Sequence, residues 1–136
     1  MNHPAPFTDA TTSLADLKAL VRDFSVERDW VQFHHPKDLG VALACEVGEL
    51  LELFRYRRDD EIRAWLDDPT NRGLVADEVA DCLWLLLRLA DVVGFDLAAA
   101  LASKVEAAGK KYPVELAKGR ADKYTAYGQS PNLKDD

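Results

Sequence analysis

Residues 74–94, LVADEVADCLWLLLRLADVVG, decide the fold class of this chain. They predict one long helix from about Leu74 to Val93, and Gly94 is placed to end it, because glycine commonly follows a helix C-terminus. A helix that is apolar around much of its circumference must be covered by other helices. The apolar residues here are Val79, Cys82, Leu83, Leu86, Leu87 and Leu89. We therefore expect this helix to lie centrally in its domain.

A second long helix is predicted to precede it, from about Asp38 to Arg58, with Asp38 as its N-cap. Its apolar residues recur at steps of three and four and form a single stripe, namely Leu39, Leu43, Val47, Leu50 and Phe54. Between the two long helices, residues 59–66 predict a short helix. Residues 68–73 contain proline, asparagine and glycine and predict a turn.

Two further helices complete the pattern. The first begins near Ser13, where Ser13 and Asp16 resemble a capping box, and the last begins after Asp96 and ends by Tyr112-Pro113. Nowhere does the sequence show the alternation of period two that half-buried strands require. The predicted fold is all-α, a four-helix bundle that assembles as an oligomer, because so apolar a central helix needs more cover than one short chain supplies.

The termini lack periodic apolar patterns. Residues 1–12 and 129–136 are predicted to be disordered, and residues 114–128 to form a basic and aromatic tail. Residues 13–128 are thus predicted to form one domain.

Composition excludes several classes of protein. The 136 residues carry a net charge of −7, which disfavours binding to nucleic acid, and no apolar stretch is long enough to cross a membrane. Cys45 and Cys82 both lie in apolar helical patterns, so we expect buried thiols in a reducing cytoplasm. An acidic protein can still bind a nucleoside triphosphate if divalent cations neutralise both partners.

Two acidic pairs point to such a site: Glu46 with Glu49, and Glu78 with Asp81. Acids three residues apart lie about 60° apart around a helix, at the edge of the buried stripe in both cases. Antiparallel packing of the two helices would bring all four carboxylates together, and they would then need a cation. Oxygen ligands favour Mg²⁺, Ca²⁺ or Mn²⁺ over zinc, and Mg²⁺ in particular is commonly shared with phosphate oxygens.

Other interpretations of the acids are a solvated helix face, structural cations in a non-enzymatic helical oligomer, and a di-iron bundle. The di-iron site would need histidines on the later helices, whereas His3, His34 and His35 all precede the second helix.

At the level of motifs, the sequence resembles the MazG-like all-α nucleoside triphosphate pyrophosphatases, of the dCTP pyrophosphatase type, over about residues 14–128. The matching segments are 27–36 (ERDWVQFHHP), 42–54 (ALACEVGELLELF), 78–81 (EVAD), 86–91 (LLRLAD), 111–115 (KYPVE), 118–119 (KG) and 123–124 (KY).

The resemblance implies Mg²⁺-dependent hydrolysis between the α- and β-phosphates, with Mn²⁺ as a substitute metal, by a homodimer or dimer of dimers in nucleotide-pool clean-up. It implies that Glu46, Glu49, Glu78 and Asp81 bind the metal, and Glu49 is our choice for the base that deprotonates water. A dUTP hydrolase of the same fold is the nearest alternative.

The resemblance also suggests substrate-binding residues. Trp30 and Tyr56 take positions of aromatic residues in the family, Trp84 is a further candidate for stacking, and His34 lies near Trp30 in sequence. Trp30 can equally be explained as packing at the end of the first helix, and His34 as a turn residue.

Lys104 and Lys111 lie seven residues apart, on one helix face, where they are placed to reach triphosphate oxygens. Two positions depart from the dCTP type: Leu85 replaces a tyrosine and Ala108 an asparagine. Both family residues contribute to nucleoside recognition, so these departures put the choice of dCTP in doubt.

Overall fold

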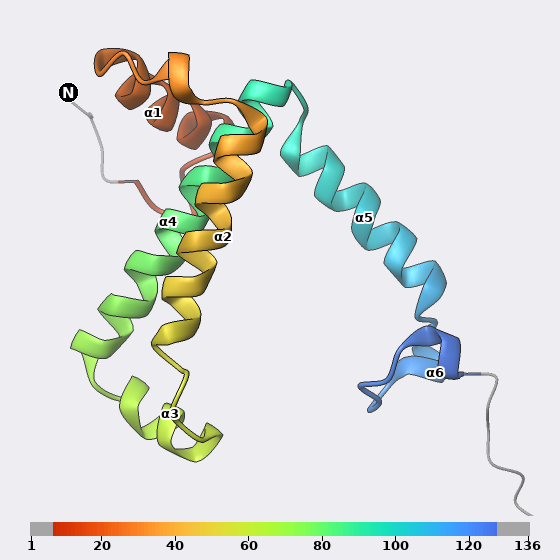
Figure 1. Cartoon of the computed structure of the whole chain (residues 1–136). Coiled ribbons are helices and arrows are strands. Elements are labelled where there is room, and N and C mark those ends of the chain that lie inside the picture. The colour runs from red at the N-terminus through yellow and green to blue at the C-terminus, as the bar shows by residue number, and fades with distance from the viewer. Residues whose placement is uncertain (1–6, 128–136) are drawn as a thin grey trace, which may run out of the picture. The chain divides into compact units, whose positions relative to one another are not determined.

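The structure is a computed structural model that describes residues 7–127, and every regular element in that range is a helix (Figure 1). The all-α prediction is confirmed. The helices are α1 (Leu14–Glu27), η1 (Val31–Phe33), α2 (Pro36–Glu52), α3 (Asp59–Leu66), α4 (Pro69–Val93), α5 (Leu97–Lys111), α6 (Val114–Ala117) and η2 (Tyr124–Ala126). No helix of the described range is long and apolar enough to span a membrane.

The chain divides into two compact units, residues 1–97 and 98–136. In the first unit α4 is central, as predicted, and packs against α2, α1 and α3. Figure 1 shows α2 and α4 side by side and running in opposite directions. The small core of this unit is formed by Val21 and Ser25 of α1, Leu39 of α2, and Leu87, Arg88 and Ala90 of α4.

Several helix ends follow the predicted chemistry. Ser13 and Asp16 form the capping box of α1, since the Ser13 N–H donates to Asp16 Oδ2 at 2.9 Å and the Asp16 N–H donates to Ser13 Oγ at 3.1 Å. Gly94 ends α4 with φ of +84°, a left-handed conformation that glycine adopts without strain. The short helix over residues 59–66 and the end of α5 before Tyr112 also agree with the predictions.

Other boundaries differ from the predictions. The predicted turn over residues 68–73 is wrong, because Asp68 caps α4 by accepting from the Thr70 N–H at 2.8 Å and Pro69 starts the helix. Likewise α2 starts at Pro36 and not at Asp38, because proline suits the first helical position, where no N–H is needed.

The second helix also ends earlier than predicted, at Glu52 and not at Arg58. The chain turns there toward α3, and Phe54 packs edge-on against Trp65 with ring centroids 6.4 Å apart. This contact, distant in sequence, overrides the helical pattern.

Within the second unit, the basic and aromatic tail predicted from residue 114 onward contains the short helices α6 and η2. Tyr112 packs edge-on against Tyr124 and Tyr127, at centroid distances of 5.6 and 6.0 Å. The disorder predicted for the termini concerns residues that lie mostly outside the described range. Residues 7–12, which lie inside it, form a turn in which the Thr8 carbonyl accepts from the Thr11 and Thr12 N–H groups.

Both cysteines are free, but the prediction of two buried thiols is wrong for Cys45, which is exposed. Other apolar side chains of α2 are exposed as well, since Val41 and Leu51 are both 60% exposed.

Candidate active site

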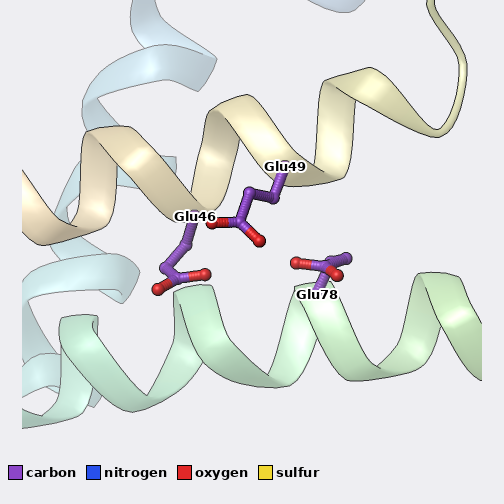
Figure 2. Close-up of side chains that lie close together, drawn as sticks. All are labelled: Glu46, Glu49 and Glu78. Carbon is purple, nitrogen blue, oxygen red and sulfur yellow. The ribbon is translucent and has the colours of Figure 1, made fainter.

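Three carboxylates from two helices meet in the first unit (Figure 2). Glu46 and Glu49 project from α2 and Glu78 projects from α4, and one oxygen of each lies within 4.8 Å of the others. The spacing of three residues brings the α2 pair to one side of its helix, and the antiparallel packing of α4 supplies the third acid.

This cluster has the properties of a cation site. Glu46 and Glu78 are half-buried, and Glu78 Oε2 is a buried atom with no hydrogen-bond partner. Burial raises the pKa of Glu46, and the negative charges of Glu49, Asp81 and Glu78 raise it further. An orphaned carboxylate oxygen beside two other acids is the environment that a hard divalent cation neutralises, so the residues present fit Mg²⁺ or Mn²⁺.

Asp81 is not part of the three-acid cluster. It lies instead with Glu46 in the wall of a cavity of about 240 Å³, which is also lined by Trp30, His34, Ala42, Trp84 and Leu85. Its carboxylate remains near enough to raise the pKa of Glu46. The structure thus brings Asp81 beside the cluster, in the wall of a largely apolar and aromatic cavity.

The aromatic wall of this cavity is organised by Phe24 of α1. Trp30 and Trp84 both pack edge-on against Phe24, with ring centroids 5.8 and 4.8 Å away. Asp29, just before Trp30, has a φ of +54°, a left-handed conformation that aspartate tolerates better than most residues. Gln32 Nε2 donates to the Asp29 carboxylate at 2.7 Å and holds this turn. The turn brings Trp30 back toward α1.

Tyr56 was predicted as a stacking residue, but it does not line this cavity. Its side chain is 82% exposed, and the Arg55 guanidinium lies 4.9 Å from its ring centroid. Because α2 ends at Glu52, Tyr56 falls in the turn toward α3.

Lys104 and Lys111 do lie together, in the second unit. They line a cavity of about 220 Å³ with Ala107, Ala108, Tyr112 and Tyr124. The Lys111 ammonium lies 5.6 Å from the Tyr124 ring centroid, a cation–π contact.

Sequence reasoning missed a charged network behind His34. Arg88 is only 4% exposed and its Nε donates to His34 Nδ1 at 2.9 Å, while its Nη1 donates to Asp91 Oδ2 at 2.6 Å. Arg22 of α1 binds the same Asp91 carboxylate with two hydrogen bonds of 3.0 and 2.7 Å. A single arginine inside an otherwise apolar run, with an aspartate three residues later, was the signal in the sequence.

Comparison with known proteins identifies the family that this chain matches. Residues 41–126 match the MazG-like family. The chain is 41% identical to dCTP pyrophosphatase 1 of Bos taurus over 124 residues. This matched region covers 90% of this chain and 72% of the bovine protein. The chain is 40% identical over 113 residues to dCTP pyrophosphatase 1 of Homo sapiens, covering 83% of this chain and 66% of that protein.

Among solved structures, the fold is similar to that of a pyrophosphatase from Archaeoglobus fulgidus. The TM-score is 0.70 and the sequence identity 35%, over 79% of this chain and 99% of the other. The match therefore extends over nearly all of that pyrophosphatase chain.

Proposed function

This chain belongs to the MazG-like family and is a nucleoside triphosphate pyrophosphatase, and we propose that it uses Mg²⁺ to cleave its substrate between the α- and β-phosphates. The products are a nucleoside monophosphate and pyrophosphate. One observation carries the proposal: three carboxylates of α2 and α4 have oxygens within 4.8 Å of one another, and one buried oxygen of Glu78 has no partner.

Each acid has a role in the proposed mechanism. Glu46, Glu49 and Glu78 would hold the metal, and Asp81, which lines the adjoining cavity, would add a fourth carboxylate beside it. When bound there, Mg²⁺ would polarise the phosphate and neutralise charge that develops during hydrolysis, and Mn²⁺ would serve as a substitute. Glu49 is the most exposed member of the cluster, so it is the acid best placed to take a proton from an attacking water.

The cavity beside the metal site accommodates the nucleoside. Trp30 and Trp84 offer aromatic surface for stacking, and Glu46 and Asp81 link this surface to the cluster. We propose a pyrimidine deoxynucleotide such as dCTP, or a base-modified relative, as the substrate, because the similar bovine and human proteins are dCTP pyrophosphatases. Lys104 and Lys111 are proposed to bind phosphate oxygens.

We also propose that the enzyme is a homodimer or a dimer of dimers. Both long helices of the first unit carry large apolar side chains that are 39% to 60% exposed, and a second copy of the chain would bury them. These residues are Val41, Val47 and Leu51 on α2, and Leu74, Val79, Leu83, Leu86 and Val93 on α4. Free cysteines and a role in the nucleotide pool fit a cytoplasmic enzyme.

A panel of triphosphates tests the proposal. The full chain is incubated with Mg²⁺ and each canonical deoxynucleoside triphosphate, dUTP and a base-modified dCTP, and the phosphate products are separated. Pyrophosphate with the monophosphate is the expected result. Orthophosphate with the diphosphate would refute the cleavage site, and a marked preference for dUTP would favour the dUTP hydrolase. No turnover of any triphosphate would favour a non-enzymatic cation-binding oligomer.

Two variants link the activity to the acids. Glu49→Gln and Asp81→Asn should each lower pyrophosphate release by about 10²- to 10⁴-fold while circular dichroism shows an unchanged helical content. Glu52→Gln is the matched control, because Glu52 lies on the same helix but is exposed and pairs with Arg55. Near-wild-type turnover in either of the first two variants would contradict the assignment of that acid.

A further inference from the structure

Arg88 is an unusual residue for its place in α4. Among the described residues it is the only buried side chain that is ionisable, and its neighbours along the helix are Leu87 and Leu89. Burying a guanidinium is costly unless its donors are paired. Two of its donors are paired at short distance, with Asp91 Oδ2 at 2.6 Å and with His34 Nδ1 at 2.9 Å.

The Asp91 carboxylate is itself fixed from a second helix. Arg22 of α1 donates to both of its oxygens, at 2.7 and 3.0 Å, so Asp91 lies between two guanidinium groups. The two arginines hold the pKa of Asp91 below its usual range, and the hydrogen bond from Arg22 is the largest cause. A carboxylate held in this way is a rigid anchor for Arg88.

The bond from Arg88 to His34 determines the state of the imidazole. Nε of arginine carries one hydrogen and cannot accept, so Nδ1 of His34 must be unprotonated in order to accept. A neutral imidazole with a bare Nδ1 carries its proton on Nε2. The ring therefore offers one N–H donor and carries no positive charge. In agreement with a neutral ring, burial and the charge of Arg88 both lower the pKa of His34.

His34 stands between two groups of charges. On one side it shares a cavity of about 370 Å³ with Arg22, Arg88 and Asp91. On the other side it lines the cavity that contains Glu46 and Asp81. A protonated His34 could pair with those two carboxylates and compete with a cation for them, whereas a neutral ring cannot.

We propose that Arg88, anchored by Asp91, is a positioning residue that fixes His34 as the neutral Nε2–H tautomer, so that His34 presents a hydrogen-bond donor to an acceptor atom of the nucleoside. The contact of His34 with the nucleoside rests on the proposed function, but the tautomer of His34 does not. Arg88 acts on the substrate only through His34. Because Arg88 is buried and paired with Asp91, it keeps the proton of His34 on Nε2.

Nitrogen NMR measures the tautomer directly. In the ¹⁵N-labelled full chain without metal or nucleotide, long-range ¹H–¹⁵N correlations distinguish a bare ring nitrogen from a protonated one, and the His34→Gln spectrum identifies the His34 signals among those of His3 and His35. We expect a bare Nδ1 and a protonated Nε2 at neutral pH. A protonated Nδ1, or an even mixture of tautomers, would overturn the proposal, and this result does not depend on any Arg88 variant.

Removing the donor should release the ring. In Arg88→Met we expect mixed tautomers and protonation of His34 at higher pH than in the wild type, while Arg63→Met, which changes an exposed arginine of α3, should leave the His34 signals unchanged. An unchanged His34 spectrum in Arg88→Met would refute the role of Arg88.

Kinetics test the consequence for the substrate. Loss of one oriented hydrogen bond should raise KM for the best triphosphate by about 2- to 10-fold in Arg88→Met with little change in kcat. An equal KM in a variant with scrambled tautomers would refute the contact with the nucleoside. Because the NMR result does not depend on turnover, an inactive wild-type protein would contradict the proposed function and leave the tautomer measurement to decide the role of Arg88.

Discussion

Replacing Glu78 by glutamine should stabilise the metal-free protein and abolish its stabilisation by Mg²⁺. In the structure Glu78 Oε2 is buried without a partner, and carboxylate oxygens of Glu46 and Glu49 lie within 4.8 Å of a Glu78 oxygen (Figure 2). The substitution keeps the shape of the side chain, removes its charge and adds N–H donors that can reach the neighbouring carboxylates.

The separation of the charges gives the magnitude. Two unit charges at the limiting separation of 4.8 Å repel by about 0.9 kcal/mol at the dielectric constant of water and by about 3.5 kcal/mol at an effective constant of about 20. Glu49 is exposed and Glu78 half-buried, so the lower half of this range applies to the pair. We expect the free energy of unfolding of the metal-free Glu78→Gln protein to rise by about 1 to 2 kcal/mol.

Thermal unfolding followed by circular dichroism measures both effects. With Mg²⁺ at tenfold excess over its Kd, the wild type should gain about 1.4 kcal/mol, or about 3 to 5 °C in Tm. Glu78→Gln should start from a higher Tm in EDTA and show no shift with Mg²⁺. Asp77→Asn, at the neighbouring exposed acid, is the control and should change stability by less than about 0.5 kcal/mol and keep the Mg²⁺ response.

Two results would refute this reasoning. A Glu78→Gln protein less stable than the wild type in EDTA would mean that the unpaired carboxylate carries no electrostatic cost. A wild-type Mg²⁺ shift in the variant would remove Glu78 from the metal site.

Burial and the neighbouring acids raise the pKa of Glu46, so the folded state holds that proton more tightly than the unfolded state. The metal-free protein should therefore lose stability as the pH rises from the ordinary glutamate range through the raised pKa. Thermal melts across this pH range should show that Mg²⁺ suppresses the loss. A flat profile in EDTA would contradict it. Light scattering at micromolar concentration should give at least a dimer, and a monomer would show that the exposed apolar faces of α2 and α4 stay uncovered. The side chains of Leu85 and Ala108 cannot form hydrogen bonds with the edge of a base. The rates at which several triphosphates are hydrolysed should therefore lie within about two orders of magnitude of the best one. A much larger preference in the panel would require an unidentified polar contact. Gly94→Ala places a side chain at a φ of +84° and should lower stability by about 1 to 2 kcal/mol, whereas an unchanged Tm would mean that the end of α4 rearranges freely.

Much of the architecture could be predicted because it depends on local rules. The apolar run of residues 79–89 predicted a central α4, and the chemistry of Ser13 and Gly94 located two helix ends. The motifs predicted the MazG-like family, which the comparisons confirm. The pairs of acids predicted a site on two helices, and the structure brings three of the four carboxylates together.

The errors in the helix boundaries have local and tertiary causes. Pro69 was assigned to a turn by composition, whereas Asp68 is the N-cap and Pro69 the first residue of α4, a local arrangement that suits both residues. Tyr56 was assigned to the substrate by its position in the family. In the structure it lies beyond the end of α2 and does not line the cavity of Trp30 and Trp84, while Phe54 packs against Trp65.

The sequence by itself determined which helix faces carry acids and apolar residues, because a period of 3.6 residues assigns every side chain to a face of its own helix. Only the tertiary structure decided which of those side chains meet. The register of α2 against α4 brings an oxygen of Glu78 within 4.8 Å of oxygens of Glu46 and Glu49 and sets Asp81 in the cavity wall. In the same way, Arg88 reaches His34 across 54 residues of sequence. Such meetings depend on how far each side chain reaches from packed helices, and no local pattern in the chain encodes that distance.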